Sequence, residues 1–115
     1  MVDGSRATAF HRACGTWRAD RSGRVKIAIL WPKRGATVAR IPQVAVELSA
    51  KQPLVESGLW VDGTALFQKG GSLSPKRETI YGAPDGPLAA GAHTVVAYAR
   101  TGSHATAVAW TFRIA

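Results

Sequence analysis

Apolar and polar residues alternate in short runs from residue 25 to the end of the chain, and glycine, proline or serine separates one run from the next. The clearest run covers residues 43–49, where Val44, Val46 and Leu48 fall on one face of an extended chain. A period of two predicts a strand with one buried face. The expected strands are residues 25–31, 43–49, 58–61, 64–68, 78–81, 93–100 and 105–114.

This arrangement of about seven strands decides the expected fold. Turn signals at intervals of about 8 to 12 residues are typical of an all-β sandwich or barrel. Asp62 and Gly63 predict a two-residue hairpin turn, because both positions of a type I′ turn need a positive φ. No segment after residue 24 has the periodicity of a helix, which argues against a parallel sheet with crossover helices. We therefore predict a single antiparallel immunoglobulin-like β-sandwich over residues 25–115.

The last two expected strands can be paired residue by residue. If residues 102–103 form a two-residue turn, Val95 faces Trp110 on the neighbouring strand. In the same register His93 faces Phe112. These residues share one face, and a slip of one residue would exchange the two faces of a strand. We therefore predict that this face lines the core.

Residues 1–24 lack the strand pattern. Their apolar residues recur at the spacing of one helical face: Phe10, Ala13, Cys14 and Trp17. Gly15 interrupts that pattern at a cost of about 1 kcal/mol relative to alanine. We expect a short basic arm, either disordered or a short helix, and we expect its deletion to change stability by less than about 1 kcal/mol.

The net positive charge is compatible with several kinds of partner and does not distinguish between them. The chain carries 15 lysine and arginine residues against 7 aspartate and glutamate residues, a formal net charge of +8. A basic surface attracts nucleic acid, anionic lipid or acidic polysaccharide, and it also maintains solubility. The sequence has no motif that reads nucleic acid, so we do not expect nucleic acid as the partner. It predicts neither a membrane-spanning helix nor a signal peptide, because no apolar stretch is long enough or placed near the N-terminus.

Residues suited to catalysis or metal binding are few and scattered. Residues 70–74 come nearest to a nucleophile elbow, but they lack its second glycine and its strand-turn-helix context. Cys14 is the single cysteine, so it forms neither an internal disulfide nor a CxxC site. His93 and His104 fall at opposite ends of the last hairpin, too far apart to share a metal. We predict no enzymatic activity and no cofactor, and we expect a ring nitrogen of His93 to bond to loop backbone.

Four short segments, taken in order, resemble bacterial immunoglobulin-like modules. They are residues 32–38 (PKRGATV), 59–63 (LWVDG), 87–95 (PLAAGAHTV) and 109–112 (AWTF). The resemblance implies a spacer or binding module of a secreted, periplasmic or surface-anchored bacterial protein. Arg34 stands where the family usually has Asp or Asn, so we expect no calcium at that turn. The implied location is extracytoplasmic or at the cell surface.

The expected third strand offers one candidate binding surface. If Leu59 and Val61 point into the core, Trp60 points outward. In immunoglobulin-like order this strand neighbours residues 93–100, which pair with the last strand. The outer face would then carry an exposed aromatic and apolar patch with two arginines: Trp60, Val96, Tyr98, Arg100 and Arg113. Such a patch suits a protein partner or an acidic glycan. The alternative flips this strand and makes Trp60 a core residue.

The sequence therefore predicts a non-catalytic binding or structural module that contacts a protein or a cell-envelope glycan. Two other functions stay open. Periplasmic copper-resistance proteins share a small immunoglobulin-like sandwich and a similar Gly-Ala-Thr-Val turn, which makes a copper-handling protein one alternative, although this chain has no Asp-x-His pair. An accessory subunit of a larger complex is the other alternative, and it would give the basic arm a partner.

Overall fold

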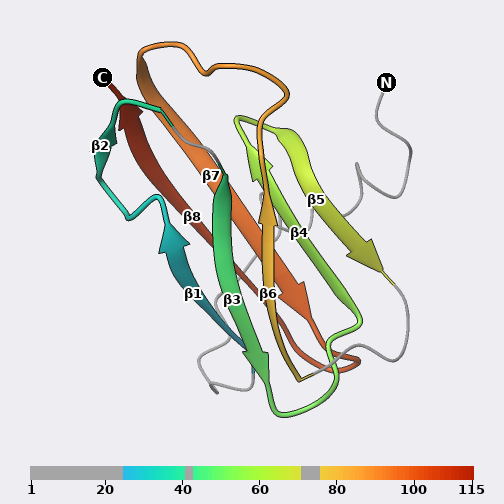
Figure 1. Ribbon diagram of the computed structural model, residues 1–115. Helices are drawn as coiled ribbons and strands as arrows, with labels where there is room; N and C mark the ends of the chain where they lie inside the picture. Colours follow the sequence, from blue (N-terminus) through green and yellow to red (C-terminus); the bar gives the residue numbers. More distant parts are fainter. Residues whose placement is uncertain (1–24, 41–42, 71–75) are drawn as a thin grey trace.

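The computed structural model describes residues 25–40, 43–70 and 76–115. These residues form strands and connecting turns without a helix, and the strands lie in two sheets packed face to face (Figure 1). The strands are β1 (Val25–Trp31), β2 (Thr37–Val38), β3 (Val44–Ala50), β4 (Glu56–Val61), β5 (Thr64–Gly70), β6 (Arg77–Gly82), β7 (Gly91–Arg100) and β8 (Ala105–Ile114). The all-β sandwich predicted from the sequence is confirmed. The predicted arm, residues 1–24, lies outside the described residues, as do residues 71–74 of the candidate nucleophile loop.

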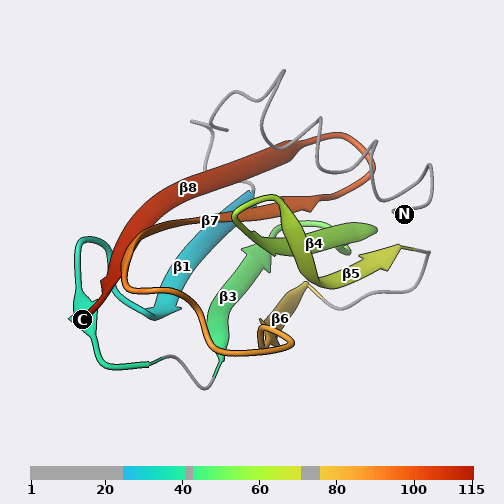
Figure 2. The same ribbon diagram turned by 90° about the horizontal axis from the view of Figure 1, so that it is seen from above.

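The two sheets form separate layers, which Figure 2 shows from above. One sheet has the strand order β1-β3-β6, and the other has the order β2-β8-β7-β4-β5. Neighbouring strands are antiparallel, except that β2 runs parallel to the end of β8. The predicted neighbours are confirmed, because β4 lies beside β7 and β7 lies beside β8. The pattern did not predict β2, since two residues are too few to show an alternation.

The register predicted for the last hairpin is confirmed. Val95 pairs with Trp110 and His93 pairs with Phe112. The turn is fixed by Thr101, whose backbone N–H donates to the carbonyl of His104 at 2.8 Å. The hydroxyl oxygen of Thr101 also accepts the backbone N–H of His104 at 3.1 Å. In the predicted β4–β5 turn, Asp62 and Gly63 both have positive φ angles, 49° and 83°.

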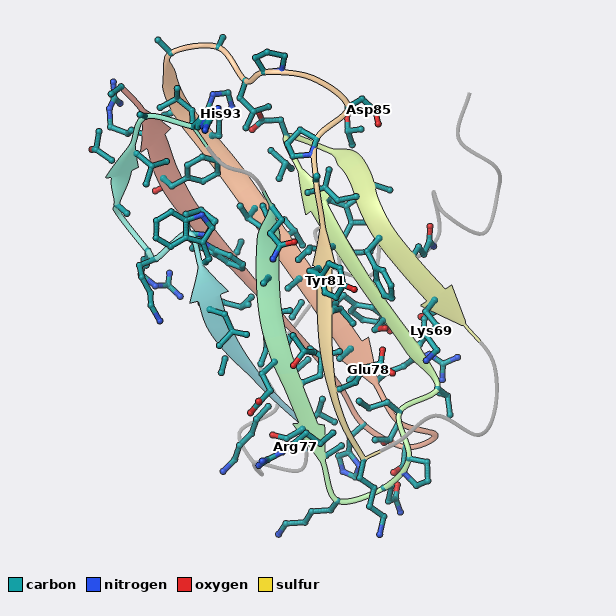
Figure 3. The ribbon with its side chains drawn as sticks, in the orientation of Figure 1. Lys69, Arg77, Glu78, Tyr81, Asp85 and His93 are labelled. Carbon is teal, nitrogen blue, oxygen red and sulfur yellow. The ribbon has the colours of Figure 1, made fainter. Side chains whose placement is uncertain are left out.

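The main core lies between the two sheets and takes its side chains from the inward-facing positions of both. Its buried members are Val25, Val44, Val46, Leu48, Leu54, Leu59, Val61, Ile80, Val95, Ala97, Ala99, Trp110, Phe112 and Ile114. The indole N–H of Trp110 donates to the carbonyl of Pro32 at 2.9 Å, so the one polar atom of this buried ring is satisfied. The sheets are also tied at their β5 and β6 edges, where the amino group of Lys69 lies 2.9 Å from a carboxylate oxygen of Glu78 (Figure 3).

A β-bulge changes the direction of Trp31 at the end of β1. Ile29 pairs with Val46, but the next residue of β3, Ala45, pairs with Trp31. Leu30 is therefore the extra residue, and Trp31 moves from the inner to the outer face of the three-stranded sheet. Trp31 is 40% exposed on that face, and the neighbouring Leu30 is 41% exposed.

Candidate functional site

The patch predicted on the five-stranded sheet is placed by strand pairing. Trp60 pairs with Val96 across β4 and β7, and Tyr98 pairs with Ala107 across β7 and β8. Directly opposed residues of antiparallel strands share a face. The two sequence neighbours of Trp60 belong to the main core, whereas Trp60 does not. The prediction that these residues share the outer face is confirmed, and the alternative with Trp60 in the main core is wrong.

The predicted exposure of this patch is wrong. Trp60 and Tyr98 are each only 2% exposed, and Val96 is 7% exposed. Together with Ala107 they form a second apolar cluster, separate from the main core. The indole of Trp60 packs directly over Gly58, because a Cβ on that glycine would lie 2.3 Å from ring atom Cη2. Alternation assigns a side chain to one face of a sheet, but it does not show how far that side chain packs against its neighbours, and here the ring lies against Gly58.

The two arginines assigned to this patch do not flank one surface. Arg100 pairs with Ala105 at the start of β8, whereas Arg113 lies eight residues further along the same strand. Eight residues of an antiparallel strand span roughly 27 Å. The Nε of Arg100 donates to a carboxylate oxygen of Glu56 at 3.2 Å, so its charge is paired within the sheet. Arg113 is exposed near the opposite end.

The polar contacts around His93 form a second candidate site. Nδ1 of His93 lies 2.6 Å from a carboxylate oxygen of Asp62, and Nε2 lies 2.6 Å from the carbonyl oxygen of Ala89. The ring also stacks on Phe112, with centroids 5.6 Å apart. Asp62 accepts a further hydrogen bond from the backbone N–H of Thr94 at 2.9 Å. The predicted bond from His93 to loop backbone is confirmed, and Figure 3 shows this residue near the start of β7, beside the β6–β7 loop.

The chemistry of these partners favours the protonated ring. A carboxylate and a carbonyl oxygen are both acceptors, so both hydrogen bonds form together only when His93 donates from both nitrogens as an imidazolium. The hydrogen bond to Asp62 raises the pKa of His93, and the bond to Ala89 adds to this, against burial, which lowers it. Burial raises the pKa of Asp62, but its bonds to His93 and Thr94 outweigh that and leave the pKa below its usual value. The pair thus locks the turn after β4 to the start of β7.

A pocket of about 290 Å³ lies beside this pair, between the β4–β5 turn and the β6–β7 loop. Its lining residues are Val61, Asp62, Thr64, Ala65, Leu66, Pro84, Asp85, Gly86, Pro87 and Leu88. The carboxylate of Asp62 already holds His93, which leaves Asp85 as the other acidic side chain of the lining. One carboxylate does not provide the several oxygen ligands that a hard cation needs.

An exposed aromatic pair lies on the outer face of the three-stranded sheet. Trp31 on β1 pairs with Ala45 on β3, and Ala45 pairs with Tyr81 on β6. We call these three residues the aromatic row. Trp31 is 40% exposed and Tyr81 is 60% exposed, whereas Ala45 between them is buried. Figure 3 shows Tyr81 on β6, in the sheet nearer the viewer.

Two of the three residues of this row, Ala45 and Tyr81, could have been placed on the outer face from the sequence. Alternation in residues 78–81 puts Ile80 inside, which leaves Tyr81 outside. Alternation in residues 25–31 puts Trp31 on the inner face with Ile27 and Ile29. The bulge that turns Trp31 outward cannot be recognised from the sequence pattern. The sequence therefore gave no reason to place Trp31 and Tyr81 together.

Two kinds of feature are absent from the residues that the structure describes. Among them no three His, Cys, Asp or Glu side chains come together as a metal site. Within the same residues there is no helix of the length and hydropathy needed to cross a membrane.

Known proteins resemble this chain in structure at low sequence identity. No family model and no curated protein matches the sequence. The structure is similar to a lytic polysaccharide monooxygenase of Jonesia denitrificans, with 15% identity and a TM-score of 0.48, over 73% of this chain and 60% of that one. It is also similar to fibronectin(III)-like modules of Clostridium thermocellum CbhA, with 16% identity and a TM-score of 0.49, over 77% of this chain and 94% of that one.

Proposed function

We propose that this chain is a non-catalytic β-sandwich module that contacts a protein or a glycan in an extracytoplasmic or cell-envelope system. The aromatic row carries the proposal. Most large apolar side chains of the described residues are buried or half-buried, yet Trp31 and Tyr81 stand exposed in one line, with Leu30 beside them. Exposed aromatic groups of this kind are enriched at contact sites.

The His93 pair supports a structural role better than a catalytic one. A general base needs a free ring nitrogen within reach of a substrate. Both nitrogens of His93 are occupied, one by Asp62 and one by Ala89, and the side chain is only 10% exposed. The same two bonds explain why this histidine sits where the chain must turn into β7.

The surface predicted from the sequence is replaced in this proposal. Trp60, Val96 and Tyr98 are buried, so their rings and methyl groups present almost no area to a partner. Arg113 is exposed, but it lies on the outer face of the other sheet from the aromatic row. The proposed contact surface is therefore the outer face of the three-stranded sheet.

Sedimentation with washed bacterial cell envelopes tests the proposal. We expect the protein to co-sediment, and we expect Trp31→Ala and Tyr81→Ala each to weaken the apparent affinity by about tenfold or more. Thr111→Ala is the matched control, because Thr111 is exposed on the other sheet. Tyr81→Ala and Thr111→Ala should leave the thermal midpoint nearly unchanged, since exposed positions shift stability by about 0.5 kcal/mol or less. Trp31 is only 40% exposed, so Trp31→Ala is expected to lower the midpoint and is compared at a temperature where it remains folded. Failure of the protein to sediment, or equal sedimentation of all variants, would contradict the proposal.

A further inference from the structure

We infer that the aromatic row binds a β-1,4-linked glycan laid across the three-stranded sheet. This inference rests on the proposed function and names the chemistry of the partner. Such glycans are flat chains whose sugar rings each have an apolar C–H face and a rim of hydroxyl groups. A flat protein surface with aromatic rings at the correct interval can stack on the C–H faces and leave the hydroxyls to polar neighbours.

The interval between the two rings fits this partner. Trp31 and Tyr81 lie on β1 and β6, the two edge strands of the sheet, with β3 between them. Neighbouring strands are about 4.8 Å apart, so the Cα atoms at the two ends of the row lie about 10 Å apart. This is about the length of a disaccharide unit, and alternate sugars of a β-1,4-linked chain present the same face at that interval. Each ring can therefore stack on one of two alternate sugars.

Ala45 keeps the row flat between the rings. It points to the outer face, because it is directly opposed to both Trp31 and Tyr81. Its methyl group is only 8% exposed, so the larger neighbours rise above it. A long side chain at this position would stand between the two rings, where the intervening sugar would pass. The row also runs the full width of the sheet, so a polymer could extend past both edges.

The polar groups of the next row suit hydroxyl partners. Glu47 pairs with Ala28 on one side and with Thr79 on the other, directly beside the aromatic row on the same face. A carboxylate accepts hydrogen bonds from sugar hydroxyls, and a threonine hydroxyl both donates and accepts. Lys26 and Arg77 lie one row further along the same face and are exposed. These cations would favour a glycan that carries acidic groups.

The extent of the apolar surface favours a glycan over a protein. A stable protein interface buries roughly 800 Å² and 20 to 30 residues on each partner, around an apolar centre. In the described part of the chain, the large apolar side chains that are exposed number three, Leu30, Trp31 and Tyr81. The rows beyond them are polar and charged, so the apolar strip is narrow. A single glycan chain needs no wider strip.

Titration of the full chain with soluble cellohexaose and chitohexaose tests the inference, with tryptophan fluorescence as the readout. The titration uses a Trp17→Phe background, which leaves three tryptophans. We expect at least one of these sugars to change the emission, because Trp31 is exposed while Trp60 and Trp110 are buried. Trp31→Ala should abolish the change, and Tyr81→Ala should weaken binding by about tenfold or more. Tyr81→Phe should bind nearly as well as the unmodified chain, because stacking uses the ring and not the hydroxyl.

Two further variants separate the row from its surroundings. Ala45→Gln should abolish binding by placing a long side chain between the rings, while circular dichroism confirms the fold. Leu30→Ala should retain binding, because Leu30 is exposed beside the row but outside it. Sedimentation with insoluble cellulose, chitin and purified peptidoglycan then distinguishes a neutral from an acidic source of the same linkage.

The outcomes separate this inference from the proposed function. If the chain binds cell envelopes through Trp31 and Tyr81 but binds none of these glycans, the inference of a glycan ligand is wrong, and the proposed contact surface is still supported. If it binds a glycan equally well after Trp31→Ala and Tyr81→Ala, the aromatic row is wrong. If it binds neither envelopes nor glycans, both proposals fall.

Discussion

Replacing Gly58 with alanine tests whether Trp60 is held down against the sheet. A Cβ at this position would lie 2.3, 2.8 and 3.0 Å from three atoms of the Trp60 ring. The ring cannot swing clear at no cost, because it is buried in one cluster with Val96, Tyr98 and Ala107. Inserting a methyl group into a packed cluster costs typically about 1–3 kcal/mol. We expect Gly58→Ala to lower the free energy of unfolding by that amount.

A double-mutant cycle isolates the contact with the ring. Trp60→Leu removes the indole atoms that the new methyl group would meet. In that background Gly58→Ala should be neutral or should stabilise by about 0.4–1 kcal/mol, because alanine reduces the entropy of the unfolded chain. The coupling between the two positions should therefore exceed about 1 kcal/mol. Urea denaturation of the four proteins measures it, with equal m-values as the check that unfolding stays two-state.

The opposite result would refute the reasoning about this face. If Gly58→Ala is neutral or stabilising in the unmodified chain, the indole of Trp60 is free to move aside. The outer face of the five-stranded sheet would then be the exposed aromatic surface that the alternation of the sequence alone suggested.

Three further predictions follow from the packing. Trp110→Ala should cost about 3–5 kcal/mol in urea denaturation, as expected for a large ring in the core, and an unchanged midpoint would mean that Trp110 faces solvent. The raised pKa of His93 should stabilise the fold below about pH 6.5, and this stabilisation should be lost as the pH rises through that pKa. The lowered pKa of Asp62 should stabilise the fold above its usual value near 3.8, and this stabilisation should be lost as the pH falls. Asp62→Asn, which tolerates the positive φ, should therefore flatten the loss of stability as the pH rises above about 6.5, and an unchanged pH profile would show that the pair is not coupled. Gly82→Ala should destabilise by about 1–3 kcal/mol in thermal unfolding, because its Cβ would lie 2.6 Å from a backbone oxygen of β5, and a neutral result would show that β5 and β6 are further apart.

The strands and the last hairpin could be predicted because their signals are local. The alternation in residues 93–100 and 105–114, with a short turn between them, allows one register that buries Trp110 and Phe112 together. Asp62 and Gly63 likewise predict their turn, since few other pairs of residues adopt the positive φ angles that both turn positions need. In these places the sequence alone contains the information that the structure uses.

The candidate site could not be predicted because it depends on contacts between distant residues. A bulge opposite Ala45 turns Trp31 outward, and that bulge reflects how β1 meets β3 rather than anything in β1 itself. The burial of Trp60 depends on its packing with β7 and β8 and on a glycine two residues away. The bond between His93 and Asp62 joins residues 31 positions apart. The pattern of a single strand can predict the face of the sheet on which a side chain lies. Whether that side chain is exposed, buried or hydrogen-bonded depends on the neighbouring strands and loops.

The indole N–H resonance of Trp31 is the most direct test of the proposed binding surface. In a nitrogen-labelled sample, the Trp31→Phe variant assigns this resonance by its loss. On addition of a β-1,4-linked oligosaccharide, the resonance of Trp31 should move with saturation, while that of Trp110, which donates to the carbonyl of Pro32 in the core, should stay in place. A bound glycan that leaves the Trp31 resonance unmoved, or moves only those of buried tryptophans, would contradict the account.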